Sequence, residues 1–163
     1  MIVLGIDPGT ATTGYGLVAE EDGELELVAF GAVITPAGQP LPIRLQTIYQ
    51  ELSSLVTKHS PAAGAVEKLF FSKNVRTAMS VGQARGVALL ALANAGLAIG
   101  EYSPLEIKQA VTGYGGADKA QVQEMVRALL GMDDIPRPDD AADGLAIAIC
   151  HLHALRLQSL IEG

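Results

Sequence analysis

The sequence predicts an α/β fold in which helices pack on the faces of a mixed β-sheet. Short apolar runs occupy the start of the chain and later alternate with segments of helical spacing, an order typical of such a sheet. The chain has 163 residues, of which 49% are apolar, so it is long enough to bury a sizeable core. The sequence contains no internal repeat, and we expect one domain over residues 1–163.

Five apolar runs, each bounded by turn or polar residues, are the predicted strands. They cover residues 2–6, 14–19, 25–34, 62–66 and 98–102. The hairpin signal Glu21-Asp22-Gly23 separates the second run from the third. Three strands in a meander, followed by strands that helices separate, indicate a mixed sheet.

Helical spacing of apolar residues predicts two helices in the middle of the chain, over residues 43–58 and 77–95. The second is apolar nearly all round, and a helix without a polar face is buried on both sides. In so small a domain this favours an interface with a second copy of the chain. A central core helix is the alternative.

Two later helices begin with capping signals. Ser103 precedes a helix that starts with Pro104, and Asp118 with Gln121 resembles a capping box before a helix over residues 119–130. These signals predict where both helices begin.

The charge of the chain is unusual for a protein that binds nucleic acid. Its net charge is −7 and its pI is about 4.8, whereas DNA-binding domains are usually basic. DNA binding would therefore require the few cations to lie on one face. It would also require some carboxylates to be neutralised by metal ions.

The sequence favours a cytoplasmic protein without membrane contact. Its single cysteine, Cys150, cannot form an internal disulfide, which suits a reducing cytosol. The first residues, MIVLGIDPGT, have no basic segment and reach Asp7 after six residues, so we expect neither a signal peptide nor a membrane span there. We expect Cys150 in the core, and His151 and His153 as ordinary helix residues rather than metal ligands.

Three segments each place carboxylates at the end of a predicted element. VLGID ends at Asp7, AGAVE ends at Glu67, and DDAAD opens a last helix that should run to about residue 161. Asp140 and Asp143 are three positions apart, so they share one helix face. An acid after a buried run is costly unless it is paired or binds a metal.

Four such carboxylates in one place would repel one another, and Mg²⁺ or Mn²⁺ would relieve the repulsion. Two ions about 3.5–4 Å apart would activate water and stabilise the leaving oxygen during phosphodiester cleavage. Each acid alone has a plainer interpretation: Asp7 as a loop hydrogen-bonder, Glu67 as a surface partner of Lys68, and Asp139 as the cap of an acidic helix start. Their joint occurrence favours the metal site.

Five sequence blocks together resemble the RuvC family of Holliday-junction resolvases, in the family's order and over nearly the whole chain. The blocks are GIDPGTATTGYG, AVEKLFFSKN, GQARGVALL, VTGYGGADKAQVQEMVRALL and PDDAADGLAIAICH. The resemblance implies a ribonuclease H-like fold, with a five-stranded mixed sheet and helices on both faces. It also implies a crossover junction endodeoxyribonuclease that acts in recombination and DNA repair.

By this resemblance, the metal-binding catalytic residues are Asp7, Glu67, Asp140 and Asp143. Some relatives place a histidine at the position of Asp140, and Asp139 beside it is a candidate substitute. The resemblance further implies two metal ions per subunit and a homodimer that nicks two strands of like polarity. The nicks leave 5′-phosphate and 3′-hydroxyl ends, and the RuvA-RuvB branch-migration complex is the implied partner.

Cations gather near the acids in the sequence. Lys73 and Arg76 follow Glu67, while Lys108 and Lys119 lie on either side of a glycine loop. Backbone amides of that loop and of the next helix N-terminus would form an anion site beside Lys119. The family has functional lysines where Lys108 and Lys119 stand, so we expect all four cations to contact DNA. Solvated surface lysines are the alternative.

Phe70 and Phe71 are adjacent, so on an extended segment they face opposite sides. An exposed aromatic beside a nuclease site can stack on an unpaired base, worth about 1–3 kcal/mol. By resemblance Phe70 is the stacking residue and Phe71 enters the core. Core packing of both is the alternative.

Three other functions compete with the resolvase. GIDPGTATTG is also similar to the phosphate-binding turn of actin-like ATP-dependent kinases, but those proteins need two such domains. A RuvC-like nuclease acting on RNA, or a YqgF-type processing factor, is closer, and the FFSKN and DDAAD segments favour the DNA resolvase over it. A junction-binding protein without catalysis would not need four converging acids. Metal-dependent nicking separates it from the enzyme.

Overall fold

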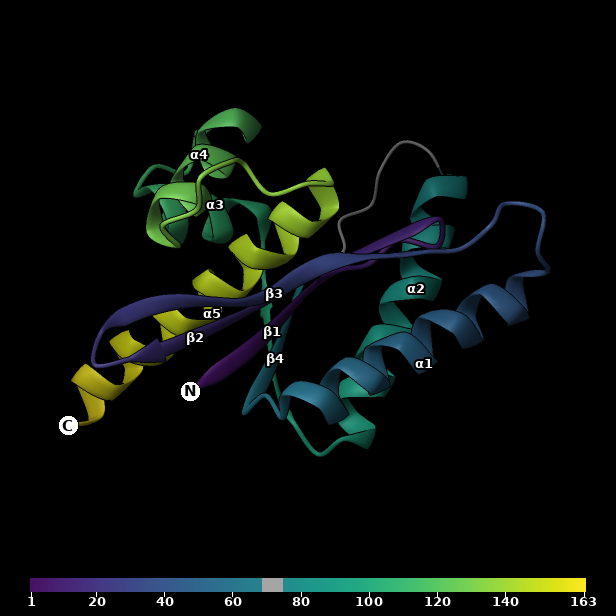
Figure 1. The fold of residues 1–163 in the computed structure, drawn as a ribbon, viewed down its shortest axis with the longest axis horizontal. Coiled ribbons are helices and arrows are strands. Elements are labelled where there is room, and N and C mark those ends of the chain that lie inside the picture. Colours follow the sequence, from purple (N-terminus) through teal and green to yellow (C-terminus); the bar gives the residue numbers. More distant parts are fainter. Residues whose placement is uncertain (69–74) are drawn as a thin grey trace.

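The protein is an α/β structure built on a five-stranded sheet, and its computed structural model describes residues 1–68 and 75–163 (Figure 1). The elements are β1 (Ile2–Asp7), β2 (Thr12–Glu21), β3 (Glu24–Ile34), α1 (Leu41–His59), β4 (Ala63–Glu67), α2 (Val75–Asn94), β5 (Ala98–Tyr102), α3 (Pro104–Thr112), α4 (Lys119–Leu129) and α5 (Asp139–Glu162). The strand order is β3-β2-β1-β4-β5. The first three strands pair antiparallel, and β4 pairs parallel with β1 and β5. The predicted mixed sheet is confirmed.

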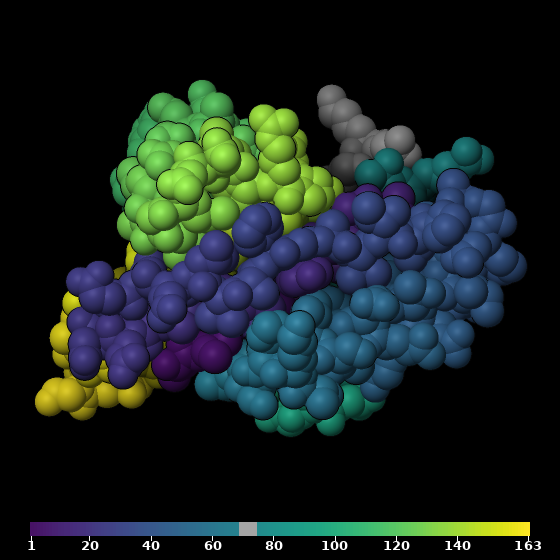
Figure 2. Space-filling view, viewed as in Figure 1, coloured from purple at the N-terminus to yellow at the C-terminus, as the bar shows by residue number. Residues whose placement is uncertain are grey.

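Helices cover both faces of the sheet. One hydrophobic cluster joins the sheet to α3, α4 and α5, and a second joins it to α1 and α2. Figure 2 shows α4 and the segment leading into α5 on one side of the β2–β3 hairpin, and α1 on the other. The two clusters form separate apolar layers, as expected for a sheet with helices on both faces.

Local signals in the sequence placed the turns and caps correctly. Asp22 and Gly23, both with positive φ, form the two-residue turn between β2 and β3, as a tight hairpin requires. The capping boxes of Ser103 before α3 and Asp118 before α4 are both formed. Helix α1 begins at Leu41, two residues earlier than expected, because proline is accepted in the first helical turn.

Helix α5 lies directly against the backbone of β1 and β2. A Cβ atom on Gly16 would come within 2.5 Å of the Leu145 nitrogen, and one on Gly5 within 2.1 Å of the Gly144 oxygen. At Gly14 it would come within 1.9 Å of the carbonyl oxygen of Asp140. Only glycine allows this approach, which carries the first turn of α5 to the end of β1.

Among the described helices, α5 alone is long and apolar enough by length and composition to cross a membrane. Half of its most apolar window is buried inside the protein, and this buried part packs on β1 and β2. Cys150 is buried there, as expected. The two histidines of α5 bond within the protein through Nδ1, His151 with the Tyr102 hydroxyl and His153 with the Ala110 carbonyl. These contacts are typical of a core helix.

Helix α2 is less buried than its composition predicted. It buries Ala84, Ala88 and Leu92 against α1 and the sheet, but Met79 is 61% exposed and Leu90 is 53% exposed. The expectation of burial on both sides is therefore not met within one chain. The outer face of α2 is apolar and open.

Candidate active site

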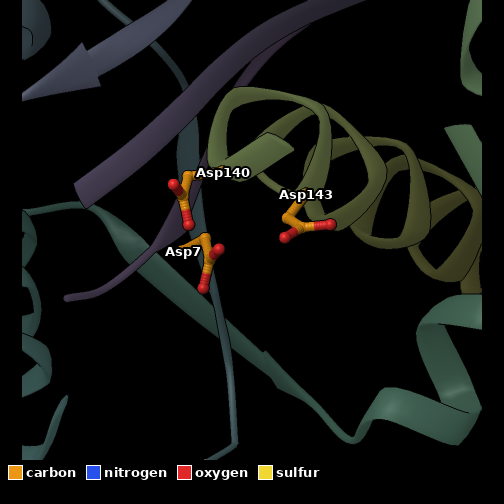
Figure 3. Close-up of side chains that lie close together, drawn as sticks. All are labelled: Asp7, Asp140 and Asp143. Atoms are coloured by element: carbon orange, nitrogen blue, oxygen red, sulfur yellow. The ribbon is translucent and has the colours of Figure 1, made fainter. Parts of the chain in front are cut away.

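Three carboxylates converge at the point where β1 ends and α5 begins (Figure 3). Asp7 is the last residue of β1, and Asp140 and Asp143 lie in the first turns of α5. One oxygen from each of the three lies within 4.8 Å of the others. The strand and helix meet this closely because Gly14, the residue of β2 paired with Asp7, has no side chain to hold Asp140 away.

Glu67 approaches the same site from the neighbouring strand. Ile6 pairs with Val66 in the parallel β1–β4 ladder, so Asp7 and Glu67 leave the sheet side by side. Glu67 is not in the group of three closest carboxylates. It lines a cavity of about 220 Å³ together with Asp143, Lys108 and Lys119. Three acids therefore form a tight cluster, and the fourth lies in the adjoining cavity.

In the metal-free chain, burial and mutual repulsion disfavour the charged form of the carboxylates. Burial first, then the charge of Asp143 and a hydrogen bond that protonated Asp7 donates to it, raise the pKa of Asp7 to about 8. Burial also raises the pKa of Glu67 and of Asp143. Partly buried carboxylates that repel one another are stabilised by protons or by hard divalent cations. The residues present thus fit a divalent-cation site.

Two lysines line the same cavity. Lys119 Nζ lies 3.4 Å from an oxygen of Asp139 and 3.8 Å from one of Asp143. Burial alone would lower the pKa of Lys119, but the charges of Asp143 and Asp139 raise it. Lys108 lowers the pKa of Glu67 against the effect of burial. Cations therefore stand next to the acids, as DNA binding by an acidic protein requires.

Comparison with known proteins identifies the family. The family model described as crossover junction endodeoxyribonuclease RuvC matches residues 3–151. The chain belongs to the RuvC family. It is 61% identical over 153 residues to the RuvC of Chloroflexus aurantiacus, covering 94% of this chain and 93% of the relative. It is 54% identical over 162 residues to that of Syntrophomonas wolfei, covering 99% and 94%.

Solved RuvC structures share the fold. Thermus thermophilus RuvC in complex with Holliday junction substrate superposes with a TM-score of 0.93 at 37% identity, covering 98% of this chain and 97% of that one. The yeast mitochondrial Holliday junction resolvase Ydc2, at 16% identity and a TM-score of 0.68, shows the fold alone. RuvC membership confirms the recognised resemblance, the ribonuclease H-like fold and the enzyme class, a crossover junction endodeoxyribonuclease.

Asp139 of this RuvC family member does not cap α5, so that expectation is wrong. The N-cap is Pro138, and no side chain caps the helix. Asp139 is already the first helical residue, and its carboxylate points to α4, where it accepts a hydrogen bond from Gln123 Nε2 at 3.2 Å and pairs with Lys119. It is also outside the group of three closest carboxylates. Asp140, not Asp139, faces Asp7.

The glycine loop offers fewer free amides than the sequence suggested. The Asp118 carboxylate accepts from the Gln121 amide, and the Asp118 amide donates to the Gln121 side chain. The amide of Tyr114 donates to Thr112, and that of Ala117 to the Tyr114 carbonyl. An anion beside Lys119 would therefore meet the remaining amides and the lysine itself.

Of the DNA contacts expected between residues 70 and 76, the structure describes only Arg76. Phe70, Phe71 and Lys73 lie outside the described residues. Arg76 is exposed in the first turn of α2. Arg85 lies beside Glu67. The sequence did not single it out, although its segment, GQARGVALL, was part of the family resemblance. The signal for it in the sequence was a single arginine within the largely apolar helix expected over residues 77–95.

Proposed function

We propose that this chain resolves four-way DNA junctions by paired symmetric nicks, with residues 1–163 acting as one nuclease domain. Asp7, Glu67, Asp140 and Asp143 hold the metal ions, either Mg²⁺ or Mn²⁺ and two per subunit. The observation that carries the proposal is the convergence of three of these carboxylates within 4.8 Å beside a cavity that two lysines line. The RuvC family membership of the chain supports it.

Divalent cations bound by these carboxylates would displace the proton that the metal-free site holds. In the free chain, burial and mutual repulsion hold a proton between Asp7 and Asp143, because the pKa of Asp7 is about 8. When bound there, divalent cations supply the positive charge that lowers the pKa of an attacking water and stabilises the leaving oxygen of the phosphodiester. Attack in line with the leaving oxygen gives 5′-phosphate and 3′-hydroxyl ends.

Cations around the cavity bind the DNA backbone. Lys108 and Lys119 line it from α3 and α4, where they would meet phosphates next to the cut bond. We include Lys73 and Arg76 as further phosphate contacts and Phe70 as the residue that stacks on an unpaired base. Such contacts would let a chain of net charge −7 bind a polyanion through one face.

The functional unit is a homodimer. A four-way junction presents two equivalent strands, and a two-fold dimer presents two equivalent sites. The outer face of α2, with Met79 and Leu90 exposed, is the interface we assign. The dimer acts in the cytoplasm, with the RuvA-RuvB branch-migration complex as its partner.

The first experiment is cleavage of a labelled synthetic four-way junction beside a linear duplex of the same sequence, with Mn²⁺, Mg²⁺ or EDTA. We expect paired symmetric nicks in the junction with either metal and none in EDTA. Asp7→Asn should abolish cutting and spare junction binding, because it removes charge and keeps shape. Asp22→Asn, in the β2–β3 turn, is the control that removes the same charge away from the site.

Other results would point to the competing functions. Binding without cutting in any metal indicates a junction-binding protein. Equal cutting of the linear duplex indicates a nuclease without selectivity for the junction. An Asp7→Asn protein that cuts at the wild-type rate would overturn the proposed site.

A further inference from the structure

We propose that Arg85, on α2, is a positioning residue that holds the end of β4 and thereby sets where the Glu67 carboxylate lies. Its Nε donates to the backbone carbonyl oxygen of Glu67 at 3.2 Å. Its Nη2 pairs with the carboxylate of Glu101 on β5. One side chain therefore clamps two neighbouring strands where both reach the candidate active site. The inference rests on the proposed role of Glu67 as a metal ligand.

Arg85 reaches Glu67 from behind. Val66 and Glu67 are successive strand residues, so their side chains point to opposite faces of the sheet. Val66 packs in the cluster that contains α1 and α2, whereas Glu67 lines the cavity that α3, α4 and α5 form. Arg85 comes from the α2 side, where it lines a small cavity with Asp7 and Glu67, and its hydrogen bond to Glu67 goes to the backbone oxygen. The carboxylate is left free for a cation.

Glu101 balances the charge of Arg85. The two side chains form an ion pair in which Arg85 is 18% exposed and Glu101 is 46% exposed. Lys108, not Arg85, is the cation that lowers the pKa of Glu67. Arg85 therefore acts through geometry rather than by competing with metal for the carboxylate.

The position of Glu67 needs such a clamp. It is the last residue of β4, and beyond it Lys68 keeps one ladder bond, from its amide to the Tyr102 carbonyl oxygen at 2.7 Å. A planar guanidinium can hold a carbonyl and a carboxylate at fixed angles, which a lysine on its flexible stem cannot. Small displacements of a catalytic group can cost about 10²-fold in rate.

Arg85→Lys tests the clamp, because it keeps the charge and loses the fork. We expect single-turnover junction cleavage at a fixed Mn²⁺ concentration to fall about ten-fold. The dissociation constant of Mn²⁺ for the DNA-free protein, measured by calorimetry, should rise, and excess Mn²⁺ should restore part of the rate. Junction binding in EDTA should not change. The Lys68 amide should exchange its hydrogen faster.

Arg127→Lys is the matched control. Arg127 also forks between a glutamate, Glu124, and a backbone carbonyl, that of Met132, but on α4. Its replacement should leave the Mn²⁺ affinity and the Lys68 exchange rate at wild-type values. Glu101→Gln removes the ion pair of Arg85. It should weaken Mn²⁺ binding and speed exchange of the Lys68 amide, each by less than Arg85→Lys does.

Two results would overturn the inference. One is an Arg85→Lys protein with wild-type Mn²⁺ affinity and cleavage rate. The other is a protein that melts earlier but keeps its Mn²⁺ affinity, since Arg85 would then only stabilise the fold. If Arg85→Lys does not fold, Glu101→Gln decides by the same Mn²⁺ measurement. Glu67→Gln separates this inference from the proposed role of Glu67 as a metal ligand. If Glu67→Gln loses Mn²⁺ affinity and Arg85→Lys does not, the role of Arg85 is overturned and the role of Glu67 stands.

Discussion

Helices α5 and α2 are both long and apolar, with 24 and 20 residues, but they contact the rest of the protein differently. Nearly every residue of α5 from Ala141 to Leu152 is buried, because glycines on β1 and β2 let it lie on the strand backbone. Helix α2 buries a stripe made mainly of alanines and leaves Met79 and Leu90 in solvent. Apolar composition alone therefore does not say what covers a helix.

The difference bears on function. The start of α5 carries Asp140 and Asp143, whose positions must be fixed to within a fraction of an ångström for catalysis. Direct contact with the strand that carries Asp7 provides that precision. Helix α2 instead has an inner face that supports β4 through Arg85 and an outer face available to a second copy. Changes at the two helices should therefore affect different properties of the protein.

Gly16→Ala should produce the largest effect, because the new methyl group would collide with the backbone of α5 at Leu145. Overpacking of this kind costs about 3 kcal/mol, and α5 would have to move away from Asp7. We expect the free energy of unfolding in urea to fall by that amount and cleavage to be lost. Gly38→Ala, where a Cβ meets nothing within 4 Å, should leave both unchanged. Wild-type stability in Gly16→Ala would contradict the close α5 contact.

Leu90→Glu tests the opposite helix. If the outer face of α2 is the dimer interface, a buried, unpaired charge there should weaken association by about 30-fold, or roughly 2 kcal/mol. Sedimentation equilibrium measures the change, and unfolding of the monomer should be little affected. Leu160→Glu, at a still more exposed leucine on α5, is the control. A dimer that survives Leu90→Glu and dissociates with Leu160→Glu would move the interface to α5.

The acid cluster predicts an unusual pH dependence for the metal-free protein. Because burial and the neighbouring carboxylates raise the pKa of Asp7 from 3.8 to about 8, the folded state binds this proton more tightly than the unfolded state. Its contribution to stability is therefore present at low pH and is lost as the pH rises through about 8. We expect the melting temperature in EDTA to fall as the pH rises from 3.8 to about 8.

Two further measurements assign that fall. Saturating Mn²⁺ should stabilise the protein most at the high end of the range, because the cation replaces the proton. Asp7→Asn should flatten the EDTA profile. A melting temperature in EDTA that rises steadily from pH 4 to 8, in the wild type and in Asp7→Asn alike, would show that Asp7 titrates normally.

The sequence predicted the elements and most of the site because both depend on local patterns. Strand runs ending in Asp7 and Glu67, and the boxes at Ser103 and Asp118, are each visible within a few residues. Their agreement with the structure reflects consistency between local preference and the global fold. The resemblance to RuvC then joined distant acids that local patterns could only place separately.

What the sequence did not predict depends on contacts between distant segments. Arg85 has a role only because β4 and β5 pair in a register that places Glu101 beside Val66, the residue before Glu67. Asp139 turns away from the site because Gln123 and Lys119 on α4 stand opposite it. The spacing of residues within one element cannot predict such contacts between elements. The glycines at positions 5, 14 and 16 were a usable signal, since alternate glycines along two paired strands leave room for a helix backbone.

Asp139→Asn should have the smallest effect and decides between the two acids that open α5. The exposed ion pair of Asp139 with Lys119 competes with a DNA phosphate for the lysine, so its removal should tighten junction binding about two- to five-fold at low salt and not at high salt. This gain in junction affinity should disappear in a Lys119→Gln background. Asp134→Asn, which removes a carboxylate that does not pair with Lys119, should give a smaller gain in affinity. Cleavage should persist, whereas Asp140→Asn should abolish it. Loss of cleavage in Asp139→Asn instead would make Asp139 a ligand, because a residue that only holds Lys119 cannot be essential to the proposed site of four other carboxylates.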